Sequence, residues 1–155
     1  MAVEIERKFL VHKDKWNALK KPSREFYRQG YIVNEPGKTI RVRQTDFKGF
    51  ITIKGATTGI SRQEFEYEIP RSEAGELLGT FTKSSLTKYR YKIEFKGKIW
   101  EIDEFQEDNE GLIVAEIELE SENEKFELPD WVDKEVTGEE KYYNSFLSVR
   151  PYKTW

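Results

Sequence analysis

Like charges recur two residues apart in several segments that otherwise alternate between polar and apolar residues. In an extended strand, residues i and i+2 point to the same face, so each pair sets two equal charges side by side. Paired carboxylates supply the hard oxygen ligands that Mg²⁺ or Mn²⁺ prefers, and paired bases can hold a ligand rich in negative oxygens. The pairs are Glu4 and Glu6, Arg41 and Arg43, Lys88 and Arg90, Glu101 and Asp103, and Glu116 and Glu118.

Several other kinds of site are excluded by composition. The chain has no cysteine, so it cannot form a disulfide, a thiolate nucleophile or a cysteine zinc site. Its single histidine, His12, cannot by itself build a two-histidine zinc site, and no nucleophile motif near it would complete a Ser-His-Asp triad. We interpret His12 as an ordinary surface residue.

The overall charge is balanced. Lys and Arg total 26 residues, Asp and Glu total 29, and the formal net charge is −3. This balance argues against a nucleic-acid binder driven by bulk positive charge, so a site for a polyanion must be a local cluster. Aromatic residues make up 14% of the chain, which is too many for a disordered protein. The length predicts a single domain over residues 1–155.

The hydrophobicity pattern predicts a protein that does not enter a membrane. No segment approaches the roughly 20 apolar residues of a membrane span. The N-terminal stretch MAVEIERKFL has no apolar signal core. We therefore expect a cytoplasmic location.

Period-two alternation dominates the chain and predicts strands. The expected strands span 2–11, 25–34, 38–45, 49–54, 61–70, 86–95, 98–105 and 113–120. Short connections with turn residues predict antiparallel pairing. Helices are expected at 14–21, 72–79, 121–126 and 138–149. The last follows Thr137-Gly138-Glu139-Glu140, a pattern typical of a capping box, and Tyr143, Phe146 and Leu147 would pack it on the sheet.

The ionic faces of these strands allow two interpretations. They can be the solvated side of an antiparallel sheet, with the apolar side facing the core. Alternatively, about eight strands close into a barrel whose interior is ionic and whose apolar faces lie outward beneath the helices. Neighbouring like charges, and the sorting of strands into acidic and basic ones, favour the barrel. The predicted fold class is α+β, mainly β: a closed eight-stranded antiparallel β-barrel, or tunnel, with a few short amphipathic helices packed outside.

The sequence resembles one family across nearly its whole length. Glu4-Ile5-Glu6-Arg7-Lys8 reproduces the ExExK signature of the CYTH superfamily, also called triphosphate tunnel metalloenzymes. Further landmarks follow in the order of the family: Arg41-x-Arg43, Lys54-Gly55, Arg62-x-Glu64-x-Glu66, Lys88-x-Arg90, Glu101-x-Asp103 and Glu116-x-Glu118. The match is to the compact bacterial members. It implies an eight-stranded tunnel that hydrolyses or cyclises triphosphorylated substrates with Mg²⁺ or Mn²⁺.

The resemblance also implies roles for single residues. The implied metal ligands are Glu4, Glu6, Glu101, Asp103, Glu116 and Glu118. The implied phosphate-binding bases are Lys8, Arg41, Arg43, Lys54, Arg62 and Arg90, and Lys141 loosely matches a basic position near the last helix. Glu64 and Glu66 match tunnel acids that either orient these bases or bind a second metal ion. Lys88 and Tyr31 match residues that act on the leaving or terminal phosphate, and with Glu4 and Glu6 they are the expected catalytic residues.

Three functions are compatible with this resemblance. The favoured one is an inorganic triphosphatase that splits tripolyphosphate into pyrophosphate and phosphate, using two Mg²⁺ or Mn²⁺ ions. The second is another enzyme with the same triphosphate grip: a class IV adenylate cyclase, a thiamine triphosphatase or an RNA 5′-triphosphatase. The third is a non-catalytic polyphosphate-binding module. The expected partner is a small-molecule triphosphate or polyphosphate and not a nucleic acid, and the sequence leaves open whether a homodimer forms.

Overall fold

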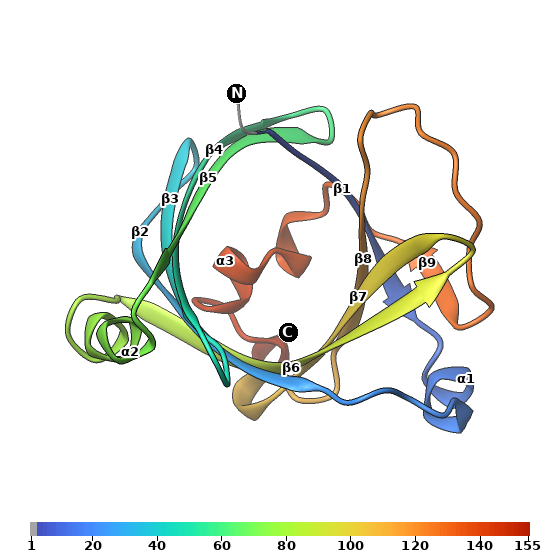
Figure 1. The fold of residues 1–155 in the computed structure, drawn as a ribbon, viewed down its shortest axis with the longest axis horizontal. Helices are drawn as coiled ribbons and strands as arrows, with labels where there is room; N and C mark the ends of the chain where they lie inside the picture. The colour runs from blue at the N-terminus through green and yellow to red at the C-terminus, as the bar shows by residue number, and fades with distance from the viewer. Residues whose placement is uncertain (1–2) are drawn as a thin grey trace.

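The structure, a computed structural model, describes residues 3–155 and consists mainly of one antiparallel sheet that is rolled into a ring (Figure 1). Position 2, where the first strand is expected to begin, lies outside this range. The strands of the described chain are β1 (Val3–Val11), β2 (Glu25–Glu35), β3 (Lys38–Gln44), β4 (Gly49–Thr58), β5 (Ser61–Ile69), β6 (Ser84–Phe95), β7 (Lys98–Phe105), β8 (Ile113–Glu118) and β9 (Val132–Glu135). Their order in the sheet is β5-β4-β3-β2-β6-β7-β8-β1-β9.

Strand β1 closes the ring because it pairs along both of its edges. Residues 6–10 pair with β8, and residues 3–5 pair with β5. Farther along, β1 pairs with the short β9 through Phe9 and Val11. The predicted closed barrel of eight antiparallel strands is therefore confirmed, and β9 is an additional strand that the sequence pattern does not predict.

The helices differ from the prediction toward the C-terminus. Helices α1 (Lys13–Ala18) and α2 (Arg71–Thr80) lie outside the ring, as expected (Figure 1). The predicted helix at 121–126 is wrong, because this stretch forms turns and irregular chain between β8 and β9. The predicted helix at 138–149 is also wrong: a 3₁₀ turn at Glu140–Tyr142 and the short α3 (Asn144–Leu147) occupy this region. Two more 3₁₀ turns lie at Glu107–Asn109 and Tyr152–Thr154.

The predicted capping box does not form because Thr137 has other partners. Its hydroxyl accepts a hydrogen bond from the backbone N–H of Lys8 (2.9 Å) and donates one to Glu135 (2.7 Å). These bonds attach Thr137 to β1 instead of to a helix N-terminus. The next residue, Gly138, has φ +82, a left-handed backbone that glycine adopts readily. A helix beginning at this point is thereby prevented.

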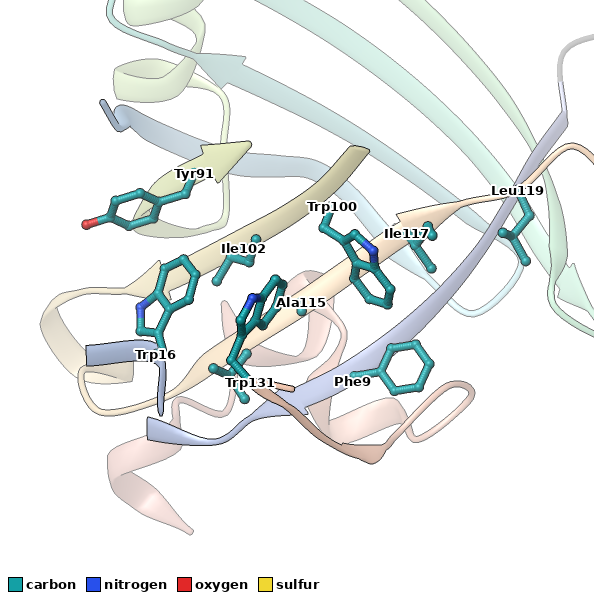
Figure 2. Close-up of a cluster of buried hydrophobic side chains, with 10 residues drawn as sticks. Phe9, Trp16, Tyr91, Trp100, Ile102, Ala115, Ile117, Leu119 and Trp131 are labelled. Carbon is teal, nitrogen blue, oxygen red and sulfur yellow. The ribbon is translucent and has the colours of Figure 1, made fainter. Parts of the chain in front are cut away.

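The largest apolar cluster packs against the outside of the ring, on β1, β6, β7 and β8 (Figure 2). Trp100 of β7 lies at its centre and is fully buried. Its ring centroid is 5.6 Å from that of Phe9 and 5.9 Å from that of Trp131, in tilted and edge-on geometries that aromatic pairs favour. Trp16 from α1 adds a further edge-on contact with Trp131. Because these apolar faces are covered from outside, the alternate residues of the same strands face inward.

The inward faces change from ionic to apolar along the strands. Four strands have an inward apolar side chain two residues away from an inward charged one. Leu10 follows Lys8, Leu86 precedes Lys88, Phe105 follows Asp103, and Val114 precedes Glu116. These apolar residues pack with Tyr142 and Leu147. Both belong to residues 137–148, here named the closing segment, which lies across the ring in Figure 1. The prediction that all helices pack outside is therefore wrong for α3.

Helix α2 covers a different part of the outer surface. Its Ala74 and Leu78 are buried against Val42 of β3. Gly49 begins β4 beneath this helix, and a Cβ added there would come within 2.7 Å of the Ala74 Cβ. Among residues 3–155, no helix combines the length and the apolarity that a membrane span requires.

We expect Gly49→Ala to lower the free energy of unfolding by about 1–3 kcal/mol, because the added methyl group overpacks the contact between α2 and β4. Urea denaturation measures the change. Gly37→Ala is the matched control, because a Cβ at Gly37 would meet nothing within 4 Å. Equal stability of the two variants would contradict this description of the α2 contact.

Candidate active site

The strands enclose a cavity of about 240 Å³ whose wall is strongly ionic. Among the described residues, seven acids and seven bases line it. The acids are Glu4, Glu6, Glu64, Glu66, Glu101, Glu116 and Glu118, and the bases are Lys8, Arg41, Arg43, Lys54, Arg62, Lys88 and Arg90. The interpretation of the ionic faces as a solvated outer surface is therefore wrong.

Strand register explains how side chains from distant parts of the sequence meet. Glu6 lies opposite Glu118, and Lys8 lies opposite Glu116. Glu116 in turn lies opposite Glu101 on β7. Across the ring, Arg41 is opposite Thr52, which is opposite Glu66. These inward positions form rows around the barrel that mix acids and bases.

Asp103 lies behind this wall and binds two of its bases. The Lys88 ammonium donates to Oδ2 at 2.7 Å, and Arg90 donates to Oδ1 and Oδ2 at 2.7 and 2.9 Å. The side chains of Asp103 and Lys88 are each 1% exposed. Burial alone would raise the pKa of Asp103, but the charges of Arg90 and Lys88 outweigh it and hold this pKa well below the usual value. Asp103 is therefore a permanent anion inside the protein.

The same surroundings that keep Asp103 charged make the charged form of Lys88 less stable. Burial, helped by the nearby charges of Arg90 and Arg43, outweighs the attraction of Asp103 and lowers the pKa of Lys88 to about 7. Its ammonium also donates to the amide oxygen of Asn144 at 2.8 Å. Lys88 can therefore gain or lose a proton near neutral pH, whereas Asp103 stays ionised.

A second cluster joins one lysine to two carboxylates. The Lys54 ammonium is 3.1 Å from Glu4 and 3.3 Å from Glu64. Burial and the charge of Glu4 raise the pKa of Glu64 to about 7, and when protonated Glu64 donates to Glu4. For Glu4, the effect of burial is outweighed by Lys54, and its pKa is lowered. Lys54 thus stabilises the ionised form of Glu4, whereas Glu64 titrates near neutral pH.

The remaining acids are less completely neutralised. Burial, together with the charges of Glu116 and Glu4, raises the pKa of Glu6 well above its usual value. The pKa of Glu118 is raised as well, first by partial burial and then by the charges of Glu4 and Glu101. Such raised values mean that this part of the wall has more negative groups than the neighbouring bases can compensate. An added cation would relieve this repulsion.

Three arginines form the basic side of the cavity. Burial, followed by the charges of Arg41 and Arg90, lowers the pKa of Arg43 to about 10. The Nε of Arg43 donates to the side-chain oxygen of Gln29 at 3.0 Å, and the guanidinium lies 4.8 Å from the centre of the Tyr27 ring. The Nε of Arg41 is buried and, within residues 3–155, has no hydrogen-bond partner. This crowding of positive charge is relieved by an anion.

Most of the predicted site residues lie on this wall, including Tyr31, and two do not. Glu6, Arg43, Arg90 and Glu118 face the same cavity. Asp103 is not on the wall, and its two oxygens accept hydrogen bonds from Lys88 and Arg90; it anchors these two bases, and its role as a metal ligand stays a prediction. Lys141 is exposed, and its ammonium lies over the rings of Trp155 and Tyr142 at 4.9 and 5.2 Å. Lys141 therefore does not line the cavity, and its contact with phosphate stays a prediction.

The closing segment supplies wall residues that the sequence pattern does not indicate. Thr137, Gly138, Tyr143, Asn144 and Ser145 all line the cavity. They are uncharged and follow no alternation. With the segment expected as a helix outside the sheet, no signal in the sequence marks them as part of the site.

The comparisons with known proteins agree with this geometry. The model of the CYTH domain matches residues 2–147. The chain belongs to the CYTH family. It is 50% identical over 156 residues to the inorganic triphosphatase of Acetivibrio thermocellus, in a match that covers all of this chain and 99% of that protein.

Several solved structures resemble this chain. The crystal structure of another inorganic triphosphatase is 30% identical, with a TM-score of 0.65, and the match covers 96% of this chain and 95% of that one. A protein from Pyrococcus horikoshii is 22% identical, with a TM-score of 0.59 over 77% of this chain and 80% of that one; this likeness shows the fold alone. Membership of the CYTH family implies dependence on a divalent metal ion.

We expect Asp103→Asn to lower the free energy of unfolding by about 3–5 kcal/mol, because it leaves two buried bases without their anion. Guanidinium denaturation at neutral pH measures the loss. Glu68→Gln is the control, because Glu68 forms an exposed pair with Lys48 at 3.7 Å, and such pairs contribute at most about 1 kcal/mol. If Asp103→Asn costs no more than Glu68→Gln, Asp103 is not the anchor described here.

Proposed function

We propose that this protein is a metal-dependent inorganic triphosphatase that hydrolyses tripolyphosphate to pyrophosphate and phosphate inside the barrel cavity. The observation that carries the proposal is the equal number of acids and bases around one small cavity. Such a wall suits a ligand that consists of an anion and cations. A condensed phosphate with bound divalent metal ions is such a ligand. The CYTH relatives named above as inorganic triphosphatases support the choice of substrate. The expected location is the cytoplasm.

In this proposal the basic side of the cavity binds the phosphate chain. Arg41, Arg43 and Arg90 present planar guanidinium groups, which match phosphate oxygens in paired hydrogen bonds. The unpartnered Nε of Arg41 is one donor that phosphate would satisfy. Lys8, Lys54 and Arg62 extend the grip along the wall. Tripolyphosphate would thereby be held in an extended form along the cavity.

The acidic side fits a divalent ion bound together with substrate. Among residues 3–155, no three carboxylates are grouped closely enough to hold a metal ion by themselves. Mg²⁺ is usually bound by one or two carboxylates, with water and phosphate oxygens completing its shell, so this arrangement is the expected one. We assign Glu4, Glu6, Glu116 and Glu118 as ligands, with Glu101 beside them, for Mg²⁺ or Mn²⁺, two ions in all. When bound, the metal neutralises charge on the phosphate oxygens.

The hydrolytic step needs positioning and charge neutralisation more than covalent chemistry. We assign Lys88 and Tyr31 to the leaving or terminal phosphate, where the ammonium of Lys88 would balance the charge that develops. Glu64, with a pKa of about 7, can accept the proton of the attacking water. Glu66 hydrogen-bonds Thr52 at 2.8 Å and contacts Arg41 at 3.4 Å, which suits it to orient that arginine.

Phosphate release from tripolyphosphate, ATP and thiamine triphosphate, each with and without Mg²⁺ or Mn²⁺, tests the proposed function. We expect tripolyphosphate to be the preferred substrate and release to require metal. Glu6→Gln should reduce the metal-dependent rate more than about 100-fold, since each lost ligand weakens both metal and substrate binding. Malachite green detection measures the released phosphate.

The control variant in this assay is Glu73→Gln, because Glu73 is exposed on α2 outside the barrel. Full activity of Glu6→Gln would refute the metal assignment. Cyclic AMP formed from ATP would favour a cyclase, and tight binding of tripolyphosphate without turnover would favour a non-catalytic binding module.

Metal binding should also release protons near pH 7. The pKa of Glu64 is raised to about 7 by burial and Glu4, and that of Glu6 lies well above its usual value, so part of this acid cluster is protonated at neutrality. A bound cation lowers these pKa values, so metal affinity should rise with pH through about 7. Calorimetry of Mg²⁺ or Mn²⁺ binding in two buffers with different ionisation enthalpies measures the protons released. Identical heats in the two buffers would contradict the assignment of this cluster as the metal site.

A further inference from the structure

Asn144 connects the closing segment to the catalytic side of the cavity. Its amide oxygen accepts hydrogen bonds from the Lys88 ammonium at 2.8 Å and from the Gln29 amide at 3.1 Å. Gln29 is fully buried, and its own oxygen accepts from Nε of Arg43. A single chain of hydrogen bonds therefore runs from Lys88 through Asn144 and Gln29 to Arg43.

The position of Asn144 is fixed independently of these bonds. It is the first residue of α3, and the segment around it is attached to the barrel at three other points. Asn34 donates to the backbone oxygen of Ser145 at 2.9 Å, and the hydroxyls of Ser84 and Ser148 lie 2.9 Å apart. Leu147 is buried in the apolar cluster at this end of the ring. The amide oxygen is thus presented to Lys88 from a rigid support.

Lys88 needs such a support because its ammonium has few places to donate. An ammonium has three N–H donors, and a buried donor without an acceptor costs free energy. Asp103 accepts from one side, where Arg90 also binds. Asn144 accepts from another side and lines the cavity with Lys88. Without Asn144, the ammonium would keep Asp103, 2.7 Å away, but would lose its second acceptor, so that its direction relative to the cavity would no longer be fixed.

We propose that Asn144 is a positioning residue, which holds the Lys88 ammonium at the cavity surface and so makes the closing segment part of the active site. The inference rests on the proposed function in assigning Lys88 to the phosphate, and it adds a residue outside the charged strand faces. Gln29 fixes the orientation of the Asn144 amide, so that oxygen and not nitrogen faces Lys88. The closing segment is then required for turnover as well as for stability.

Two substitutions of similar size separate the hydrogen bond from the shape of the side chain. Asn144→Leu removes the acceptor, and we expect kcat for tripolyphosphate to fall about 10- to 100-fold with little change in KM, as for a displaced catalytic group. Asn144→Asp keeps the acceptor, so kcat should recover to within about fivefold of the wild type, while KM rises because the added charge repels phosphate.

Asn17→Leu is the matched control, because it makes the same substitution at an exposed residue of α1, outside the ring. Its kcat should stay within about twofold of the wild type, and thermal melts of all variants verify folding. If the loss of kcat in Asn144→Leu matches the loss of folded protein in the melts, the role of Asn144 is structural and the proposal is overturned. If Asn144→Leu has wild-type kcat, the proposal is wrong.

A double-mutant cycle shows whether Asn144 acts through Lys88. In the Lys88→Met background, Asn144→Leu should change kcat less than twofold, because the group that it positions is already gone; such non-additivity is typical of residues that act as a unit. Losses that multiply would show that Asn144 acts by another route and would overturn the proposal.

Crystal structures of the wild type and of Asn144→Leu provide a readout that does not depend on turnover. We expect Lys88 to lose its single position in the variant: Nζ stays within hydrogen-bond distance of Asp103, and the side chain changes rotamer or occupies more than one. An unchanged Lys88 would overturn the inference even if the wild type hydrolyses tripolyphosphate. A wild type without triphosphatase activity would overturn the proposed function alone, since the position of Lys88 in the two structures still tests the role of Asn144.

Discussion

Asp103 makes the ionic interior of this barrel compatible with folding. Lys88 and Arg90 extend from β6 into a space enclosed by protein, where an unpaired charge is costly. A single buried carboxylate binds both of them from behind the cavity wall, leaving part of each base facing the cavity. The other charges of the wall are held in smaller groups, such as Lys54 between Glu4 and Glu64. The site is therefore a set of small clusters in which both signs of charge meet, and not a field of one sign.

The aromatic cluster outside the ring is the counterpart of this interior. A small barrel usually fills its centre with apolar side chains, and here the centre is a cavity. The largest apolar cluster is instead buried on the outer face, where α1, β9 and the chain around Trp131 cover Trp100 and Phe9. The same alternation that puts Trp100 outside puts Glu101 and Asp103 inside. Core and site are two faces of the same strands.

The sequence predicts the strands and the ionic wall because both depend on period-two alternation, which is a local property. Glu4, Arg41 and Glu116 could be placed on one interior without knowing how the strands pair. The C-terminal part could not be predicted, since its structure depends on tertiary contacts. Thr137 bonds to β1 rather than capping a helix, and Asn144 reaches the cavity only because Leu147 packs inside the ring. The same holds for Asp103 and Lys141. The sequence shows their charge, but it does not indicate that Asp103 binds Lys88 and Arg90 or that Lys141 lies over Tyr142 and Trp155.

The pairing of β1 has a consequence for the order of assembly on the ribosome. This first strand has partners at residues 61–63, 114–118 and 132–135, so its two edges cannot both be satisfied until most of the chain has been made. Contacts so distant in sequence form slowly. Glu4 can meet Lys54 as soon as β4 and β5 are made, whereas Glu6 and Lys8 lack the residues opposite them until β8 is made. A nascent chain truncated before β8 would therefore hold an open sheet, in which β1 can pair with β5 while its edge for β8 stays unpaired.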